Sequence, residues 1–243
     1  MKSTSTRRMI LLAAASGAAA MSSLAGAAVQ DDSQRNEDRG PGEIKDVGSV
    51  EDLMREHGVL RRILLIYQQT AVKLRDGDSV DVNALNGAAQ LFRTFGEDYH
   101  EKMLEESFIF PALRKIRSPV AAYPDVLIAQ HHRGRKITDY IIDVTAHHKL
   151  STSRAAALSH AFDGIALMYQ NHAAREDTLV FPAWKQALAE RDLDEIGDKF
   201  EDIEQQQFGK DGFETIVDQV GEIEKTLGYA DLAQFTAPMP PSA

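Results

Sequence analysis

The sequence predicts an all-α protein, built as an antiparallel up-and-down four-helix bundle with extra C-terminal helices and preceded by a signal peptide. Aromatic residues make up only 7% of the 243 residues, and long runs of Val, Ile, Thr and Tyr that would indicate strands are absent. Apolar residues instead recur at intervals of three and four, which places them on one face of a helix. Four long segments of this kind, joined by short connections, bury their apolar faces most simply as an antiparallel bundle.

The composition narrows the classes of protein that the chain can belong to. It contains no cysteine, which excludes disulfides, a thiolate metal site and a cysteine nucleophile. Its net charge of -10 argues against a general nucleic-acid-binding protein, whose affinity depends on cationic contacts to phosphate. With 43% hydrophobic residues, the chain can bury a sizeable core.

The first 28 residues are predicted to be a signal peptide. A basic start with the pair Arg7-Arg8 precedes an apolar stretch dominated by Ala, Gly and Ser, and residues 24–28 offer small-residue cleavage positions. The two arginines fit a twin-arginine export signal, and an ordinary secretory signal is the alternative. We therefore expect an exported, periplasmic protein without membrane contact after cleavage, in which residues 29–48 form a disordered linker.

The bundle itself is predicted within residues 49–190. The first helix begins in a capping-box-like pattern with Ser49 as N-cap, and Pro124 lies in the first turn of the third helix. The four predicted helices cover about residues 49–76, 82–117, 125–148 and 151–189. Residues 191–230 are predicted to be a helical extension, and residues 231–243 a flexible tail.

An internal repeat contains the residues that suggest chemistry. Residues 105–113 on the second predicted helix match residues 176–184 on the fourth, at an offset of 71 residues. His57 and His131 lie 74 residues apart, and an arginine follows each of them four residues later. The chain therefore looks like two helix pairs related by an approximate two-fold axis. Each pair supplies one histidine from its first helix, and a histidine plus a carboxylate from its second.

This arrangement is suited to metal binding. His172 and Glu176 are four residues apart, so they lie on one face of a helix and can bind one centre together. Such pairs on facing helices, doubled by the repeat, give two metal positions bridged by carboxylates. Imidazole and carboxylate ligands without thiolate suit iron or manganese, and zinc is acceptable.

At these residues the sequence resembles the hemerythrin-like family, the His-His-Glu cation-binding domains. The resemblance covers about residues 50–188 and is carried by the segments 51–60, 98–102, 130–131 and 172–182. It implies a four-helix bundle with a non-haem di-iron centre that binds dioxygen reversibly, senses oxygen or iron, or handles nitric oxide or peroxide. The expected metal ligands are His57, His100, Glu105, His131, His172 and Glu176, with Glu101 as an extra or alternative ligand.

Two features depart from the pattern of this family. His100 is followed by Leu104 at four residues and by Glu105 at five, which leaves His100 and Glu105 about 140° apart on a regular helix. Either a π-bulge lies between them, which we favour, or Glu101 binds in place of His100. Arg135 stands where oxygen-carrying hemerythrins have a second histidine, which argues against simple oxygen transport.

Residues beside the expected ligands allow two interpretations each. Glu106 and Asp177 either accept hydrogen bonds from ligand imidazoles or are solvated charges. Tyr99 and Tyr169 are interpreted as core residues, and donation to a metal-bound small molecule is the alternative.

We expect a protein that binds or senses dioxygen, nitric oxide or peroxide through a dinuclear iron centre, and we favour this over an enzyme. The alternatives are a di-iron oxidase or peroxidase, and a metal-holding bundle of iron homeostasis without redox turnover. The sequence indicates a small-molecule ligand, no nucleic acid and no particular protein partner.

Overall fold

The computed structural model describes residues 47–147 and 149–241, and this part of the chain is helical with no strand. The elements are α1 (Ser49–Asp76), α2 (Val82–Leu91), η1 (Phe92–Ile109), α3 (Phe110–Leu113), η2 (Pro119–Ala122), α4 (Tyr123–Thr145), α5 (Thr152–Arg175), η3 (Glu176–Val180), α6 (Phe181–Ala187), α7 (Glu190–Phe208), α8 (Gly212–Leu227) and η4 (Leu232–Phe235). The all-α prediction is therefore confirmed for these residues. The predicted signal peptide, and the predicted linker up to residue 46, lie outside them.

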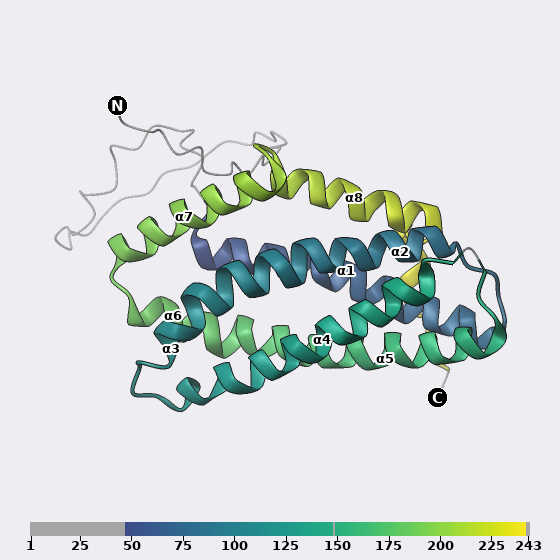
Figure 1. Ribbon diagram of the computed structural model, residues 1–243, viewed down its shortest axis with the longest axis horizontal. Helices are drawn as coiled ribbons and strands as arrows, with labels where there is room; N and C mark the ends of the chain where they lie inside the picture. Colours follow the sequence, from purple (N-terminus) through teal and green to yellow (C-terminus); the bar gives the residue numbers. More distant parts are fainter. Residues whose placement is uncertain (1–46, 148, 242–243) are drawn as a thin grey trace, which may run out of the picture. The chain divides into compact units, whose positions relative to one another are not determined.

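Four helical rods lie side by side in the unit that covers Gly48–Ala243 (Figure 1). They are α1, the continuous rod α2–η1–α3, α4, and the continuous rod α5–η3–α6. Helix α1 packs against α5, α2 packs against α4, and α4 packs against both α5 and η1. The rods therefore enclose a shared interior, as expected for a helix bundle.

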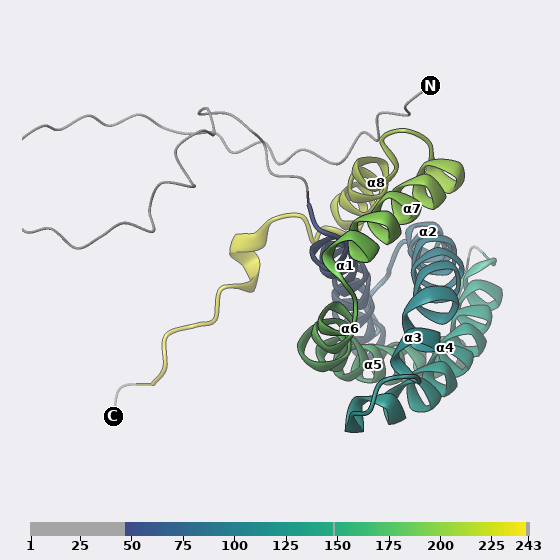
Figure 2. The same ribbon diagram turned by 90° about the vertical axis from the view of Figure 1, so that its left-hand side faces the viewer.

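Helices α7 and α8 pack on the outside of these rods, as the end-on view shows (Figure 2). Helix α8 contacts α2 and α1, and α7 contacts α1 and η1. The predicted C-terminal extension is thus helical and rests on the first two rods. None of the described helices has the length and hydrophobicity of a membrane span.

Helix α1 shows how the local sequence sets the ends of an element. Its first helical residue is Ser49, so the predicted N-cap is displaced by one residue to Gly48. The Glu51 carboxylate accepts the Gly48 N–H at 3.2 Å, which satisfies a donor that the first turn leaves unpaired. Gly77 ends the helix at φ 82°, a left-handed conformation that glycine adopts without steric cost.

The interior contains a polar layer between two aromatic layers. On one side, Tyr67 stacks on Phe162 with ring centroids 4.5 Å apart, and the edge of Phe92 contacts Tyr169 at 5.1 Å. On the other side, Phe110 and Phe181 are fully buried at the starts of α3 and α6. Each such side chain contributes about 1.5–3 kcal/mol by burial. The apolar layers therefore hold the rods together around the polar one.

Both long rods contain a π-helical segment directly before a Phe-Pro pair, namely η1 before α3 and η3 before α6. Proline has no N–H to donate, and its ring collides with the carbonyl four residues earlier in a regular α-helix. A wider π-helical turn accommodates such a residue without ending the rod. The backbone therefore accommodates the proline, and each rod continues.

Candidate metal centre

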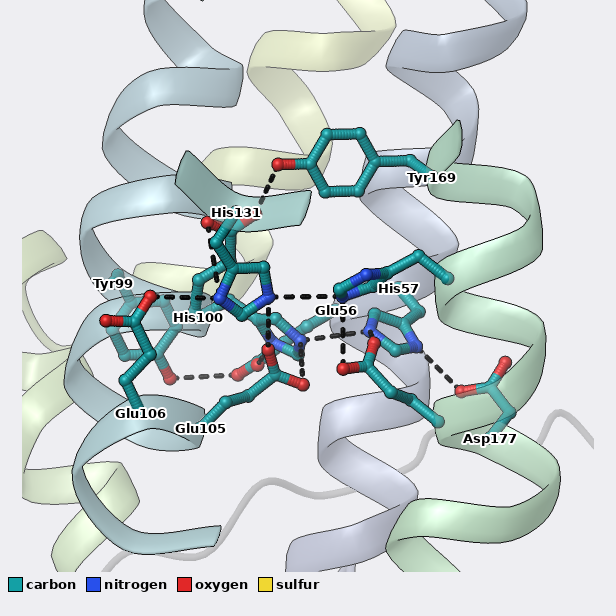
Figure 3. Close-up of polar contacts among 12 residues, drawn as sticks. Glu56, His57, Tyr99, His100, Glu105, Glu106, His131, Tyr169 and Asp177 are labelled. Atoms are coloured by element: carbon teal, nitrogen blue, oxygen red, sulfur yellow. Dashed lines mark hydrogen bonds and ion pairs between the residues drawn. The ribbon is translucent and has the colours of Figure 1, made fainter. Parts of the chain in front are cut away.

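Four histidines and two glutamates from the four rods meet in the polar layer (Figure 3). They are His57 of α1, His100 and Glu105 of η1, His131 of α4, His172 of α5, and Glu176 at the start of η3. Each of these side chains is at most 3% exposed. Buried carboxylates and imidazoles at this density require partners or a bound cation, because water cannot solvate them.

The π-helical backbone of η1 explains how His100 and Glu105 reach the same place. In a π-helix the backbone hydrogen bonds join residues five apart, so residues five apart lie nearly above one another. The His100 Nε2 and Glu105 Oε1 atoms are accordingly 3.4 Å apart. The equivalent pair, His172 of α5 and Glu176 at the start of η3, is four residues apart, and its Nε2 and Oε1 atoms are 3.0 Å apart.

The first potential metal position, called position 1, lies between His57 and His100. Their Nε2 atoms are 3.0 Å apart. Glu105 offers its Oε1 to this pair, and the Glu176 Oε2 lies 3.5 Å from the Nε2 of His57.

The second potential metal position, called position 2, lies between His131 and His172, whose Nε2 atoms are 3.1 Å apart. The Glu105 Oε2 lies 3.3 Å from His131, and the Glu176 Oε1 lies 3.0 Å from His172. Each glutamate therefore offers one oxygen to each position, which is the arrangement of a bridging carboxylate.

The donor atoms fit two cations. None of the four oxygens of Glu105 and Glu176 has a hydrogen-bond partner although all are buried, an arrangement that costs free energy unless a cation binds them. Two ligands on neighbouring sites of one metal, each at about 2.1 Å, are roughly 3 Å apart. The distances of 3.0 and 3.1 Å between the paired Nε2 atoms match that value.

Every candidate ligand imidazole has its second nitrogen held by an outer residue. The Nδ1–H groups donate to these acceptors: His57 to Asp177 at 2.7 Å, His100 to Glu56 at 2.6 Å, His131 to Glu106 at 2.9 Å and His172 to Gln130 at 2.9 Å. Such bonds fix the tautomer, orient the ring and leave Nε2 for a metal. Of the two interpretations of Glu106 and Asp177, the structure therefore shows the hydrogen-bonding one.

Sequence reasoning missed Glu56 and Gln130. A signal for them was present, because they directly precede His57 and His131 at equivalent positions of the repeat. The arginines of the repeat also have a role here. Arg61 pairs with Asp177, and Arg135 donates to Glu106 at 2.6 Å, so each cation balances an outer carboxylate.

Glu101 lies beside position 2, among different partners. Its carboxylate accepts the Tyr169 hydroxyl at 2.6 Å and the Arg135 guanidinium at 3.1 Å, and it lies 3.8 Å from the Nδ1 of His131. The six other predicted ligands are brought together around positions 1 and 2. A role of Glu101 as an alternative ligand stays a prediction.

The carboxylates make the centre favourable for positive charge. Burial opposes protonation of His131, yet Glu101, Glu105 and Glu106 raise its pKa to about 10. Burial likewise opposes protonation of His100, while Glu105 and Glu56 raise its pKa well above the ordinary value. A site that stabilises protons this strongly also attracts metal cations, which compete for the same nitrogens.

A cavity reaches the centre between α1 and α5. Beside the candidate ligands it is lined by Leu60, Arg61, Leu64, Glu101, Tyr169 and Ala173. Leu60, Leu64 and Ala173 give this lining an apolar surface, and Arg61, Glu101 and Tyr169 add a guanidinium, a carboxyl and a hydroxyl group.

Comparison with known proteins agrees with this geometry. The sequence pattern of the hemerythrin HHE cation-binding domain matches residues 48–184. The chain belongs to the hemerythrin HHE family. Uncharacterized proteins of Mycobacterium tuberculosis and Mycobacterium bovis are similar, with 43% identity over 197 residues, or 78% of this chain and 74% of theirs. No solved structure matches the chain significantly. The predicted family is thus confirmed, and it makes cation binding by the buried histidines and glutamates the expected property of the domain.

Proposed function

We propose that this hemerythrin-like protein is exported, folds as an antiparallel up-and-down bundle, and uses two non-haem irons to bind or sense dioxygen, nitric oxide or peroxide. One observation carries the proposal: two buried histidine pairs, with Nε2 atoms 3.0 and 3.1 Å apart, face the unpaired oxygens of Glu105 and Glu176. Nitrogen and oxygen donors without thiolate favour iron or manganese, and zinc is acceptable.

The number of protein donors supports small-molecule binding. Each position has two imidazoles and one oxygen from each bridging glutamate. An octahedral metal needs six ligands, so four donors leave places for exchange. When bound, iron supplies those exchangeable places and a change of oxidation state.

The side chains around the cavity decide what reaches the centre. Leu60, Leu64 and Ala173 present an apolar surface that suits small neutral molecules, beside the charged groups of Arg61 and Glu101. Two of the lining residues are joined by a hydrogen bond, in which the Tyr169 hydroxyl donates to Glu101 at 2.6 Å. That placement also favours a second candidate function, a peroxidase or oxidase, because such turnover requires a proton source near the reacting molecule.

Elemental analysis of the purified protein tests which metal it binds and how many ions. Its visible spectrum, recorded before and after addition of oxygen, nitric oxide or peroxide, tests whether one of these molecules binds. Two irons per chain and a spectral change with one of these molecules are the expected results. Catalytic consumption of peroxide with a reductant would favour the second candidate. A protein without metal, or with zinc and no visible band, would contradict the proposal.

Cell fractionation tests the proposed export. The double substitution Arg7→Lys and Arg8→Lys keeps the charge and removes the arginine pair that a twin-arginine signal requires. The expected result is that the wild-type chain reaches the periplasm and the variant stays in the cytoplasm. Equal export of the two chains would favour an ordinary secretory signal, and retention of both in the cytoplasm would contradict export.

A further inference from the structure

Helices α7 and α8 form a C-terminal extension beyond the residues matched to the family, and one of its side chains lies close to position 1. Glu204 of α7 is only 6% exposed. Its Oε1 accepts the backbone N–H of Phe213, at the start of α8, at 2.9 Å. Its Oε2 lies 3.4 Å from the hydroxyl oxygen of Tyr99 on η1.

Two further hydrogen bonds connect Tyr99 to a candidate ligand (Figure 3). The Tyr99 hydroxyl donates to Glu56 Oε1 at 2.8 Å. The other oxygen of Glu56 accepts the Nδ1–H of His100 at 2.6 Å, and both residues are 1% exposed. A connected set of polar contacts therefore runs from the extension to an imidazole of position 1.

The packing around Glu204 fixes this arrangement. A Cβ atom added to Gly212 would lie 2.7 Å from Glu204 Oε1 and 3.0 Å from its Cγ, so the backbone of α8 approaches as closely as glycine allows. The ring of Phe208, at the end of α7, meets Tyr99 edge-on with centroids 5.3 Å apart. The extension thus confines both the carboxylate of Glu204 and the ring of Tyr99.

The two halves of the repeat differ at this point. Gln130 occupies the place of Glu56 and accepts the Nδ1–H of His172 at 2.9 Å. The ring of His100 in position 1 therefore has a buried carboxylate behind it, whereas the ring of His172 in position 2 has a neutral amide.

We infer that the C-terminal extension positions His100 for metal binding at position 1, through Glu204, Tyr99 and Glu56. A carboxylate that accepts the ring N–H orients the imidazole and raises its basicity as a ligand. Tyr99 keeps the Glu56 carboxylate from turning away, and Glu204, the second acceptor within reach of the same hydroxyl proton, connects Tyr99 to the extension. The inference rests on the proposed function in one respect, because it requires that the histidines bind metal.

Cobalt(II) is a suitable probe, because it replaces iron at nitrogen and oxygen sites and shifts the NMR signals of ligand ring N–H protons. The metal-free, full-length protein is titrated by calorimetry, and the NMR spectrum of the loaded protein is recorded. The key variant is Tyr99→Phe, which removes only the hydroxyl group. Tyr140→Phe, at a side chain that is 38% exposed on α4, is the matched control.

We expect the wild-type protein to bind two cobalt ions. In Tyr99→Phe, one of the two dissociation constants should rise by less than the roughly tenfold that is typical when a hydrogen bond to the ligand itself is lost, while the other stays unchanged. One exchangeable ring N–H signal, that of His100, should shift. A general loss of packing would instead weaken the binding of both ions and lower the melting temperature.

Glu204→Gln tests the role of the C-terminal extension itself. Glutamine keeps an acceptor for the Phe213 N–H, so α7 and α8 stay in place, but its NH2 group replaces the oxygen that accepts from Tyr99. The same dissociation constant should rise by a smaller factor, and Glu214→Gln, an exposed exchange on α8, should change neither constant.

Unchanged dissociation constants in both variants would overturn the inference and leave the proposed function standing. So would an equal rise in the dissociation constants of both ions. An effect of Tyr99→Phe without an effect of Glu204→Gln would overturn the role of the extension. Absence of cobalt binding by the wild-type protein would overturn the inference and the proposed function together.

Discussion

At the scale of single residues, the centre depends on two glutamates that serve both metal positions. Glu105 and Glu176 each direct one oxygen to position 1 and the other to position 2. A histidine, by contrast, has one Nε2 and belongs to one position. Loss of a glutamate should therefore affect two ions, and loss of a histidine one.

The substitution Glu176→Ala should consequently reduce metal content from two ions per chain to nearly none. Most helicity should remain, since the rods are held by apolar layers such as Tyr67 on Phe162. Elemental analysis and circular dichroism measure the two effects. Glu195→Ala, at an exposed position of α7, is the control and should keep both ions. Full metal occupancy in Glu176→Ala would contradict its assignment as a ligand.

A second residue-scale prediction concerns Gly134 of α4. An added Cβ atom there would lie 2.0 Å from the Tyr169 hydroxyl oxygen, so Gly134→Ala must displace Tyr169 from Glu101. Overpacking of this kind costs about 1–3 kcal/mol in the free energy of unfolding.

Gly164→Ala in α5 is the matched control, because nothing lies within 4 Å of its added Cβ atom. This exchange should stabilise the helix by roughly 0.5–1 kcal/mol. Denaturant unfolding of both variants measures the difference in their free energies of unfolding. A stabilised Gly134→Ala variant would show that the close approach of Tyr169 to Gly134 is not needed for the stability of the fold.

At the scale of elements, the sequence predicted the helices better than their internal geometry. Periodicity, the cap pattern at Ser49 and Pro124 located the four rods to within a few residues. The spacing of His100 and Glu105 indicated a π-bulge, but η1 is π-helical over 18 residues. That length was not predictable, because α- and π-turns differ by one hydrogen-bond register and no residue type marks the difference. Glu204 was missed for another reason: its partners Tyr99 and Phe213 lie on other helices, so no spacing within one helix reveals it.

The π-helix leads to a prediction about its register. Deletion of Leu104 places His100 and Glu105 four residues apart, as His172 and Glu176 are in α5. The segment can then return to a regular α-helix with both side chains on one face, so two ions should still bind. Deletion of Ala174, in the regular helix α5, is the matched control. It turns the part of the rod that contains His172 by about 100° relative to the part that contains Glu176, so the two side chains cannot both keep their present directions and metal content should fall. Loss of metal in the Leu104 deletion with an intact far-ultraviolet spectrum would contradict the compensating role of η1.

At the scale of the whole molecule, the apolar layers and the metal centre contribute to stability in opposite ways when metal is absent. The aromatic layers favour the folded bundle regardless of metal. The polar layer places the carboxylates of Glu105 and Glu176 together without solvent and without hydrogen-bond partners, which opposes folding. The family relationship and the buried donor set were predictable from sequence because both depend on local motifs. The opposing contributions of the aromatic layers and the polar layer to stability could not be predicted, because they depend on which side chains of different rods face one another.

Metal binding should therefore raise the stability of the entire bundle. Each ion present at about 100 times its dissociation constant adds about 2.7 kcal/mol to the free energy of unfolding, provided that the unfolded chain does not bind it. For a chain of this length that corresponds to a rise in melting temperature of roughly 5–10 °C per ion. Calorimetric melting of the metal-free protein at increasing cobalt(II) concentrations measures the effect, and Glu176→Ala in the same series should melt at a temperature independent of cobalt. A wild-type melting temperature that does not change with cobalt would show that positions 1 and 2 do not bind this cation in the folded state.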